Sequence, residues 1–211
     1  MEVCRGSMIQ LLNFANAVTI GSRSPEWLFK ILDVFETLRD LMPKFESMFS
    51  NQYCVVLRNE AITIWKRLGE AIRGIFMELE NLIRRDPVKA AVPGGGFHPI
   101  TRYVMNYLRA TCRSCQTLEQ VFDENVVPSK GVSPSLSSSL SVQMDWIMEL
   151  LEGNLEAKSK IYKDPALSSV FMMNNGRYIV QKVKDSELGG LLGEDWIRKH
   201  NAKVQQCYSS Y

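Results

Sequence analysis

This 211-residue chain has few residues that could bind a metal in a cluster. It has only two histidines, His98 and His200, and its five cysteines lie at irregular spacing. Structural zinc needs clustered Cys and His ligands, and Cys112-Arg-Ser-Cys115 has no second ligand pair. We therefore expect no metal and interpret this pair, inside a predicted helix, as packing. The odd number of cysteines and the lack of an Asn-x-Ser/Thr site favour free thiols in a reducing compartment.

A membrane-spanning or secretory segment is also missing from the sequence. The longest uncharged run, residues 6–22, contains Gln10, Asn13 and Asn16 and is too short and too polar to cross a bilayer. The segment before it begins with Glu2 and lacks the cationic region of a signal peptide. The formal net charge is only +2, so composition predicts no general attraction to nucleic acid. We expect a cytosolic protein that binds no nucleic acid.

Catalytic motifs are absent as well. Residues 94–96 are three glycines, but no Lys-Ser or Lys-Thr follows them, so they predict a flexible turn rather than a phosphate-binding loop. Asp145, Glu149, Glu152 and Glu156 share one helix face, yet a di-metal site in a bundle also needs Glu-x-x-His partners. We expect these acids to form a solvated stripe or a contact surface for a basic partner. The sequence predicts a protein that is not an enzyme and has no cofactor.

What the sequence does contain is apolar residues at helical spacing along almost its whole length, with no convincing strand pattern. A proline or glycine separates most of the predicted helices. The predicted helices are residues 8–18, which Gly21 ends; one that Ser24-Pro25-Glu26 begins; a short piece from Pro43; residues 53–83; residues 99–122; residues 140–155; one from Asp164-Pro165 to a break at Asn175-Gly176; one around residues 178–183; and, after a turn at Gly189, Gly190 and Gly193, one from Glu194.

The predicted helix over residues 53–83 determines the expected architecture. At 1.5 Å per residue it would be roughly 46 Å long, and other helices must cover its apolar stripe throughout. We predict an all-α fold, an elongated rod of stacked antiparallel helical bundles. Residues 1–90 would form the first bundle and residues 91–211 the second, with a flexible loop near residues 125–140, which are rich in Ser, Pro and Gly.

The charges of the predicted helix 99–122 are placed against its dipole. Arg102, Arg109 and Arg113 lie in its first half, and acidic residues lie at its end, in residues 119–124. A solvated helix favours the opposite arrangement. The pattern indicates pairing either with neighbouring helices or with a partner, and the sequence does not choose between them.

The short piece from Pro43 carries more large apolar side chains than so small an element needs. One interpretation is a lid over the bundle core, because most large apolar residues are buried. The other is a groove between this piece and the long helix, which would receive an aromatic anchor from a partner peptide. The candidate partner-binding residues are Phe45, Met48, Phe49, Tyr53, Trp65 and Phe76, with Trp65 or Phe76 at the floor.

Three separated runs of sequence carry a resemblance to a known family. They are His98-Pro-Ile-Thr-Arg-Tyr-Val-Met-Asn-Tyr-Leu; Asn154-Leu-Glu-Ala-Lys-Ser-Lys-Ile-Tyr-Lys-Asp-Pro-Ala-Leu with Phe171-Met-Met-Asn-Asn-Gly-Arg-Tyr-Ile-Val; and Asp195-Trp-Ile-Arg-Lys-His. In this order they resemble the plant family of the seventy-kilodalton exocyst subunit. The similarity extends across nearly the whole chain.

The resemblance implies a function that the residues alone do not reveal. Members of this family are non-catalytic rods of helical bundles in the exocyst, which tethers secretory vesicles to the plasma membrane during exocytosis. The expected partners are other exocyst subunits, and the expected location is cytoplasmic, peripheral at the plasma membrane. Because the family continues beyond both ends of this sequence, we expect its phosphoinositide-binding surface to lie outside this chain. Some plant members are pathogen-effector targets or decoys, so a peptide- or effector-binding module in immunity is the alternative.

Overall fold

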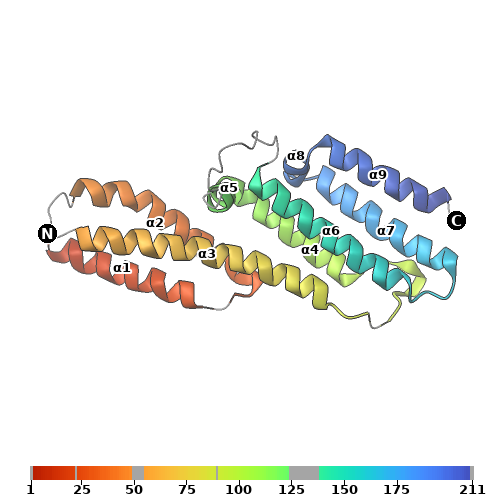
Figure 1. Ribbon diagram of the computed structural model, residues 1–211, viewed down its shortest axis with the longest axis horizontal. Helices are drawn as coiled ribbons and strands as arrows, with labels where there is room; N and C mark the ends of the chain where they lie inside the picture. Colours follow the sequence, from red (N-terminus) through yellow and green to blue (C-terminus); the bar gives the residue numbers. More distant parts are fainter. Residues whose placement is uncertain (1, 22, 49–54, 89, 124–137, 210–211) are drawn as a thin grey trace, which may run out of the picture. The chain divides into compact units, whose positions relative to one another are not determined.

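The computed structural model describes residues 2–21, 23–48, 55–88, 90–123 and 138–209. Over these residues the regular structure is entirely helical, without a strand, which confirms the predicted all-α class (Figure 1). None of the helices in this part of the chain is long and apolar enough to cross a membrane. The chain forms two compact units, Met1–Leu79 and Glu80–Tyr211. The division falls inside α3, whereas the predicted boundary between the two bundles lies near residue 90.

The first unit contains α1 (Glu2–Ile20), α2 (Leu28–Met48) and most of α3 (Val55–Arg85). As predicted, a new helical segment begins at Pro25, where a single 3-10 turn, Pro25–Trp27, leads into α2. The core of the unit is formed by the inward-facing aliphatic and aromatic residues of the three helices. Those at most 2% exposed are Leu12, Ala15, Leu28, Ile31, Leu32, Phe35, Leu38, Ala61, Leu68, Ile72, Ile75, Phe76 and Leu79.

Pro43 does not begin a separate helix, contrary to the prediction. It lies inside α2, which continues to Met48. A proline in a helix interior removes one backbone hydrogen bond, but its neighbours, such as Leu41, Met42 and Lys44, favour the helical conformation. The cost at this one position is therefore compatible with a continuous helix.

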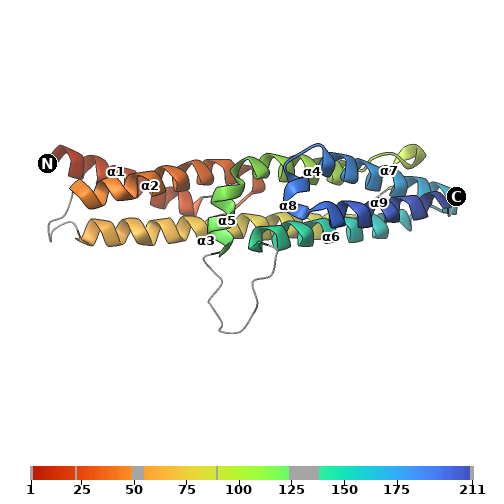
Figure 2. The ribbon, with the colours of Figure 1, turned by 90° about the horizontal axis from the view of Figure 1, so that it is seen from above.

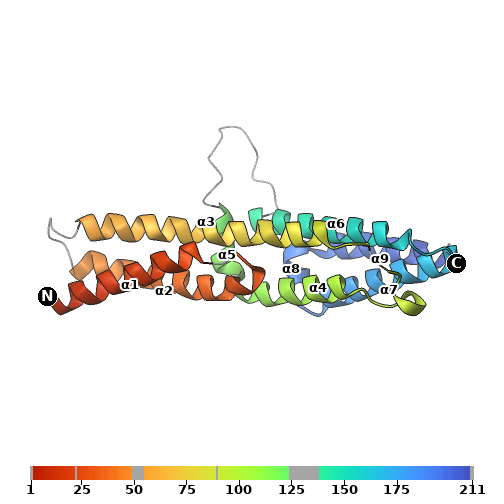
Figure 3. The ribbon, with the colours of Figure 1, turned by 90° about the horizontal axis from the view of Figure 1, so that it is seen from below.

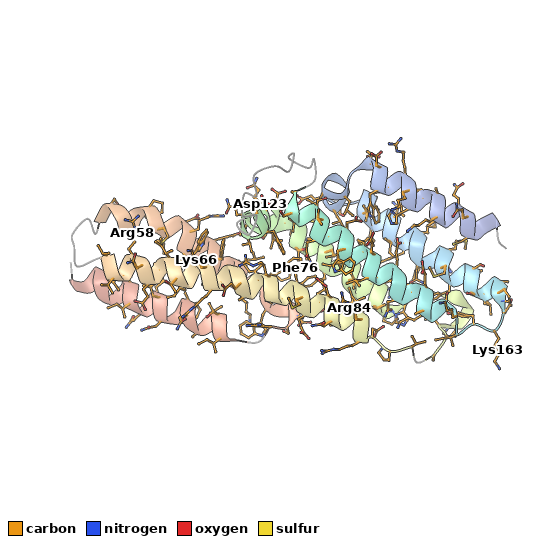
Figure 4. The ribbon with its side chains drawn as sticks, in the orientation of Figure 1. Arg58, Lys66, Phe76, Arg84, Asp123 and Lys163 are labelled. Carbon is orange, nitrogen blue, oxygen red and sulfur yellow. The ribbon has the colours of Figure 1, made fainter. Side chains whose placement is uncertain are left out.

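The long helix predicted over residues 53–83 is α3, which has 31 residues. It ends at Arg85, directly before Asp86-Pro87, because a residue that precedes proline is disfavoured in the helical conformation. Its buried residues recur every three or four positions, from Leu57 through Leu68 to Ile83. Figure 4 labels Phe76, which is 1% exposed, among these core side chains of α3.

The second unit contains α4 (Pro99–Thr111), α5 (Cys115–Asp123), α6 (Ser139–Ser159), α7 (Pro165–Lys184), α8 (Leu188–Leu192) and α9 (Glu194–Ser209). Figures 2 and 3 show α4, α6, α7 and α9 side by side, with consecutive long helices running in opposite directions. The predicted single helix 99–122 is wrong in one respect. A 3-10 turn, Cys112–Ser114, separates α4 from α5. At the end of α4, directly before this turn, the Thr111 hydroxyl donates to the Leu108 carbonyl at 2.7 Å.

The predicted break at Asn175-Gly176 is also wrong, because α7 continues through both residues. Both residues pack against neighbouring elements and do not form a turn. Asn175 is fully buried, and a Cβ atom at Gly176 would lie 2.9 Å from Val204 Cγ2 of α9. Gly189 and Gly190, predicted to form a turn, lie within the short helix α8. Residues 125–137 of the predicted loop near residues 125–140 lie outside the described residues.

Candidate functional site

The segment that joins α3 to α4, residues 86–98, is described except for residue 89, and it receives hydrogen bonds from α6 and α7; we call it the connector. Its turn needs glycine, because Gly94 and Gly95 have φ values of 62° and 65°. Gly95 is buried, and a Cβ atom there would lie 3.0 Å from the backbone nitrogen of Phe171 in α7. The predicted turn is confirmed, and its second glycine is packed directly against a helix.

Asn175 of α7 fixes the end of the connector with all the hydrogen-bonding atoms of its amide. Its Oδ1 accepts from the His98 backbone N–H at 3.0 Å and from the Thr101 hydroxyl at 2.8 Å. Its Nδ2 donates to the carbonyls of Phe171 at 2.8 Å and Gly96 at 3.3 Å. Buried polar groups are costly to leave without partners, so this single side chain specifies the path of the connector.

His98 caps the helix that follows. Its Nδ1 accepts a hydrogen bond from the Ile100 backbone N–H at 3.2 Å, and Pro99 occupies the first helical position, as predicted. Burial, together with the charge of Lys158, lowers the pKa of His98 below its ordinary value, although Asp86 opposes this effect. A neutral imidazole is what the cap requires, because a protonated Nδ1 has no lone pair to accept with.

Side chains of α6 hold the other end of the connector. Lys158 is only 3% exposed, and its Nζ donates to the carbonyls of Asp86 at 3.0 Å and Pro87 at 3.1 Å. The same Nζ lies 3.0 Å from Asp86 Oδ2. Asn154 Nδ2 donates to the Ile83 carbonyl at 2.8 Å and so satisfies a carbonyl in the last turn of α3. Asn154 and Lys158, which belong to the second family-like run, therefore hydrogen-bond the backbone of residues 83–87, upstream of the first run at His98.

The third family-like run lies in α9 and joins it to α6. Trp196 Nε1 donates to Asp145 Oδ1 at 2.8 Å, and the Trp196 ring stacks on His200 at 3.6 Å between centroids. Glu152 accepts from His200 Nε2 at 2.9 Å and from Lys203 Nζ at 2.7 Å. The predicted solvated acidic stripe is thus wrong for Asp145 and Glu152, which face α9.

The charged pairs of α9 have a structural role. Burial raises the pKa of Glu152, but the hydrogen bonds from His200 and Lys203 outweigh burial and hold the pKa below its ordinary value. His200 Nδ1 lies 2.7 Å from the Trp196 carbonyl, so both of its ring nitrogens are engaged. A histidine held on both sides is not available as a general base for a substrate.

A cavity of about 390 Å³ lies among α6, α7 and α9. Met172 and Ile179 of α7 line it together with Leu155 of α6 and Val204 of α9, while Glu152 and Lys203 supply charge. Its volume lies within the usual range of small-molecule pockets. The chemistry of its lining suits apolar groups, and both ring nitrogens of the histidine in the lining, His200, are already engaged by Glu152 and the Trp196 carbonyl.

Cys112 and Cys115 come together at the 3-10 turn. Burial, with smaller effects of Cys115 and Glu187, raises the pKa of Cys112 to about 12. Burial also raises the pKa of Cys115. Thiols that stay protonated are poor nucleophiles and poor metal ligands. Within the described residues, no group of three or more His, Cys, Asp or Glu side chains is placed to hold a metal ion.

The structure describes the side chains of two of the candidate partner-binding residues, Trp65 and Phe76. Phe45 and Met48 belong to α2, but their side chains, like all of Phe49 and Tyr53, lie outside the described residues. Trp65 is half-buried and stacks on Phe35 at 4.9 Å between ring centroids. Phe76 packs in the core of α3 and does not line an open groove.

Sequence reasoning missed a surface cluster of α3 and α6. Trp146 is 42% exposed, and its Nε1 donates to Glu80 Oε2 at 3.0 Å. Gln143 Nε2 donates to Glu80 Oε1 at 2.9 Å, and the Arg84 guanidinium lies 5.8 Å from the Trp146 ring centroid. Figure 4 labels Arg84 near the end of α3. Each of these contacts joins a residue of α3 to a residue of α6 more than 60 positions away, and no local pattern signals it.

Comparison with known proteins identifies the class to which this helical architecture belongs. The family described as the C-terminal part of the Exo70 exocyst complex subunit matches residues 1–211. The chain belongs to this family of exocyst subunits, which is non-catalytic, and the predicted resemblance is confirmed.

Individual relatives support the same assignment. The chain is 78% identical over 212 residues to the exocyst complex component EXO70B1 of Arabidopsis thaliana, covering 100% of this chain and 33% of that protein. It is 61% identical to EXO70B2 of the same plant, covering 100% of this chain and 35% of that protein. EXO70I of Medicago truncatula is 30% identical, with 94% of this chain and 29% of that protein covered. The chain spans about a third of the length of these relatives.

Proposed function

We propose that this chain is a helical scaffold section of an exocyst subunit, which tethers secretory vesicles to the plasma membrane during exocytosis. The observation that carries the proposal is the family match over residues 1–211. The partners of this scaffold are the other subunits of the exocyst. It works in the cytoplasm, peripherally at the plasma membrane.

The geometry of the second unit supports a scaffold role. Its conspicuous polar side chains, Asn175, Lys158 and Glu152, are used to fix helices and the connector rather than to face a substrate. Fully satisfied buried networks rigidify a fold, because breaking one leaves several groups without partners. A rigid helical surface suits a protein that must present fixed contact sites to several partners.

Affinity isolation of the complete protein from plant cells tests the proposal. We expect the tagged protein to recover the other exocyst subunits in constant ratio, and a matched tag alone to recover none. Recovery of the folded protein without any exocyst subunit would contradict the scaffold assignment.

A second candidate function is capture of a partner peptide, such as a pathogen effector, at Phe45, Met48, Phe49, Tyr53 and Trp65. One observation favours it: Trp65 Nε1 is a buried donor that has no hydrogen-bond acceptor among the residues that the structure describes. A donor left without a partner inside a protein carries a desolvation cost, which a carbonyl from a bound peptide would remove after local opening. Comparison of the Phe49→Ala variant with the unaltered protein in peptide-binding and thermal-unfolding assays distinguishes a contact residue from a core residue.

A further inference from the structure

Positive charge is segregated in the middle of a chain that is nearly neutral overall. No Asp or Glu occurs between Asp86 and Glu119, while Lys89, Arg102, Arg109 and Arg113 all fall in this interval. The net charge of the whole chain is only +2. The helix at the centre of the interval, α4, therefore has no acid of its own to pair with its arginines.

Three of these arginines form a row along α4 and the turn after it, together with Asn106. Positions 102, 106, 109 and 113 are spaced by four, three and four residues, which places them on one helix face about 16 Å long. Arg102, Asn106 and Arg113 are exposed, and Arg109 is half-buried. We call these four residues the arginine row.

The sequence left open whether these arginines pair with neighbouring helices or with a partner, and the structure distinguishes the two. Among the described residues, Arg102, Arg109 and Arg113 have no ion pair or side-chain hydrogen bond within the chain. Arg109 Nε is even shielded from solvent without an acceptor. No acid in the described part of the chain is therefore paired directly with the row. A guanidinium is a planar fork of donors that matches a carboxylate in bidentate geometry, so the row is suited to carboxylates.

The surface beside the row is hollow and carries the opposite charge on its far wall. A cavity of about 350 Å³ is lined by Asn106, Arg109 and Arg113 on one side and by Asp185 and Glu187, which follow α7, on the other. Ala110 leaves room between the arginines. A uniformly anionic, flat surface would be repelled by the two acids and would not enter the hollow. A polypeptide with acidic residues toward the row and basic residues toward the acids is complementary to both walls.

We propose that the arginine row is a docking surface for an acidic segment of another exocyst subunit. This inference rests on the proposed function and adds the chemistry of the partner to it. The partner segment presents Asp or Glu side chains at helical spacing to Arg102, Arg109 and Arg113. Its basic side chains lie beside Asp185 and Glu187.

Charge reversal at the two exposed arginines tests the docking surface in the complete protein, assembled with the remaining exocyst subunits. Arg102→Glu/Arg113→Glu should weaken assembly at least tenfold, and the loss should shrink at high salt because screening weakens the attraction in the unaltered protein. Arg177→Glu/Lys199→Glu is the matched control, since it makes the same change in net charge at exposed positions of α7 and α9. Arg109→Gln, which removes one charge without reversing it, should weaken assembly by a smaller factor.

A photo-crosslinking residue at position 106 identifies the partner segment. We expect the crosslinked peptide to contain at least two acidic residues, and reversal of those acids to Lys should restore assembly of Arg102→Glu/Arg113→Glu. Unchanged assembly, a loss equal to that of the control, or a crosslink to a segment without acids would overturn the inference and leave the scaffold function standing. If the unaltered protein does not assemble, the proposed function itself fails.

Vesicles containing phosphatidylserine distinguish a membrane from a protein partner. The unaltered protein and Arg102→Glu/Arg113→Glu should bind these vesicles equally. Loss of vesicle binding by the variant, with exocyst assembly intact, would assign the row to anionic lipid and overturn the docking proposal. Circular dichroism and thermal unfolding of each variant establish that the fold is retained.

Discussion

Replacement of Asn175 by alanine should loosen the connector without unfolding the rest of the second unit. The amide accepts from the His98 N–H and the Thr101 hydroxyl, and it donates to the carbonyls of Gly96 and Phe171. The hydroxyl of a threonine in a helix can rotate toward a carbonyl of the preceding turn. The Phe171 carbonyl keeps its helical hydrogen bond from the backbone N–H of residue 175. The His98 N–H and the Gly96 carbonyl are the groups left without partners.

The expected magnitude follows from these two groups. Each buried group without a partner costs roughly 1–3 kcal/mol, so Asn175→Ala should lower local stability by about 3 kcal/mol. At 1.4 kcal/mol per factor of ten, amide exchange of His98 should accelerate by about two orders of magnitude. The neighbouring Asn174 makes one bond to the same turn, from Nδ2 to the Gly95 carbonyl at 2.8 Å. Asn174→Ala is therefore the matched control, with an expected cost of about 1 kcal/mol.

Hydrogen exchange, followed for the peptide that covers residues 96–101, measures this effect directly. The variant Asn175→Asp keeps the acceptor oxygen but places its second carboxylate oxygen against the Gly96 and Phe171 carbonyls at a fully buried position, so it should protect the connector no better than Asn175→Ala. Equal exchange in Asn175→Ala and Asn174→Ala would refute the view that Asn175 specifies the connector.

Three further perturbations follow from the same structure. Gly95→Ala should destabilise the protein by about 2 kcal/mol or more, and Gly94→Ala by about 1 kcal/mol, because both have positive φ but only Gly95 faces a neighbour at 3.0 Å; equal melting temperatures would contradict this. The pKa of His98 is lower in the folded protein than its ordinary value of 6.5, so near and below pH 6.5 the unfolded state binds more protons than the folded state. The free energy of unfolding should therefore fall from pH 7 to pH 5. His98→Asn, which still caps the helix, should flatten that slope in urea titrations, and an unchanged slope would assign it to other groups. Phe49→Ala should weaken partner-peptide binding by about 2 kcal/mol if Phe49 is a contact, whereas a lower melting temperature with unchanged affinity would end the groove hypothesis there.

Local signals predicted most of the helices because local chemistry decides them. Pro99 after a glycine turn, Pro25 after Ser24 and Asp86-Pro87 after a long apolar stripe each act within a few residues. The same reasoning failed at Pro43 and at Asn175-Gly176. There, residues that usually interrupt helices lie within continuous ones, and the reason for Asn175 is a connector more than 70 positions away.

The pairing of charged residues in the site depends on contacts between distant parts of the chain, which the sequence alone does not reveal. The acids at Asp145 and Glu152 have the spacing of a solvated stripe, and only the placement of Trp196, His200 and Lys203 on α9 shows that they are paired. The arginines of α4 illustrate the opposite case. Their unusual position was visible in the sequence, but the absence of intramolecular partners among the described residues required the structure.

The residence time of secretory vesicles at the plasma membrane tests the central claim most directly. In plant cells from which the protein and its close relatives have been removed, single-vesicle imaging should show shorter residence before fusion. Re-expression of the complete protein should restore the original residence time. Unchanged residence after removal, with the other exocyst subunits still at the membrane, would contradict a tethering role.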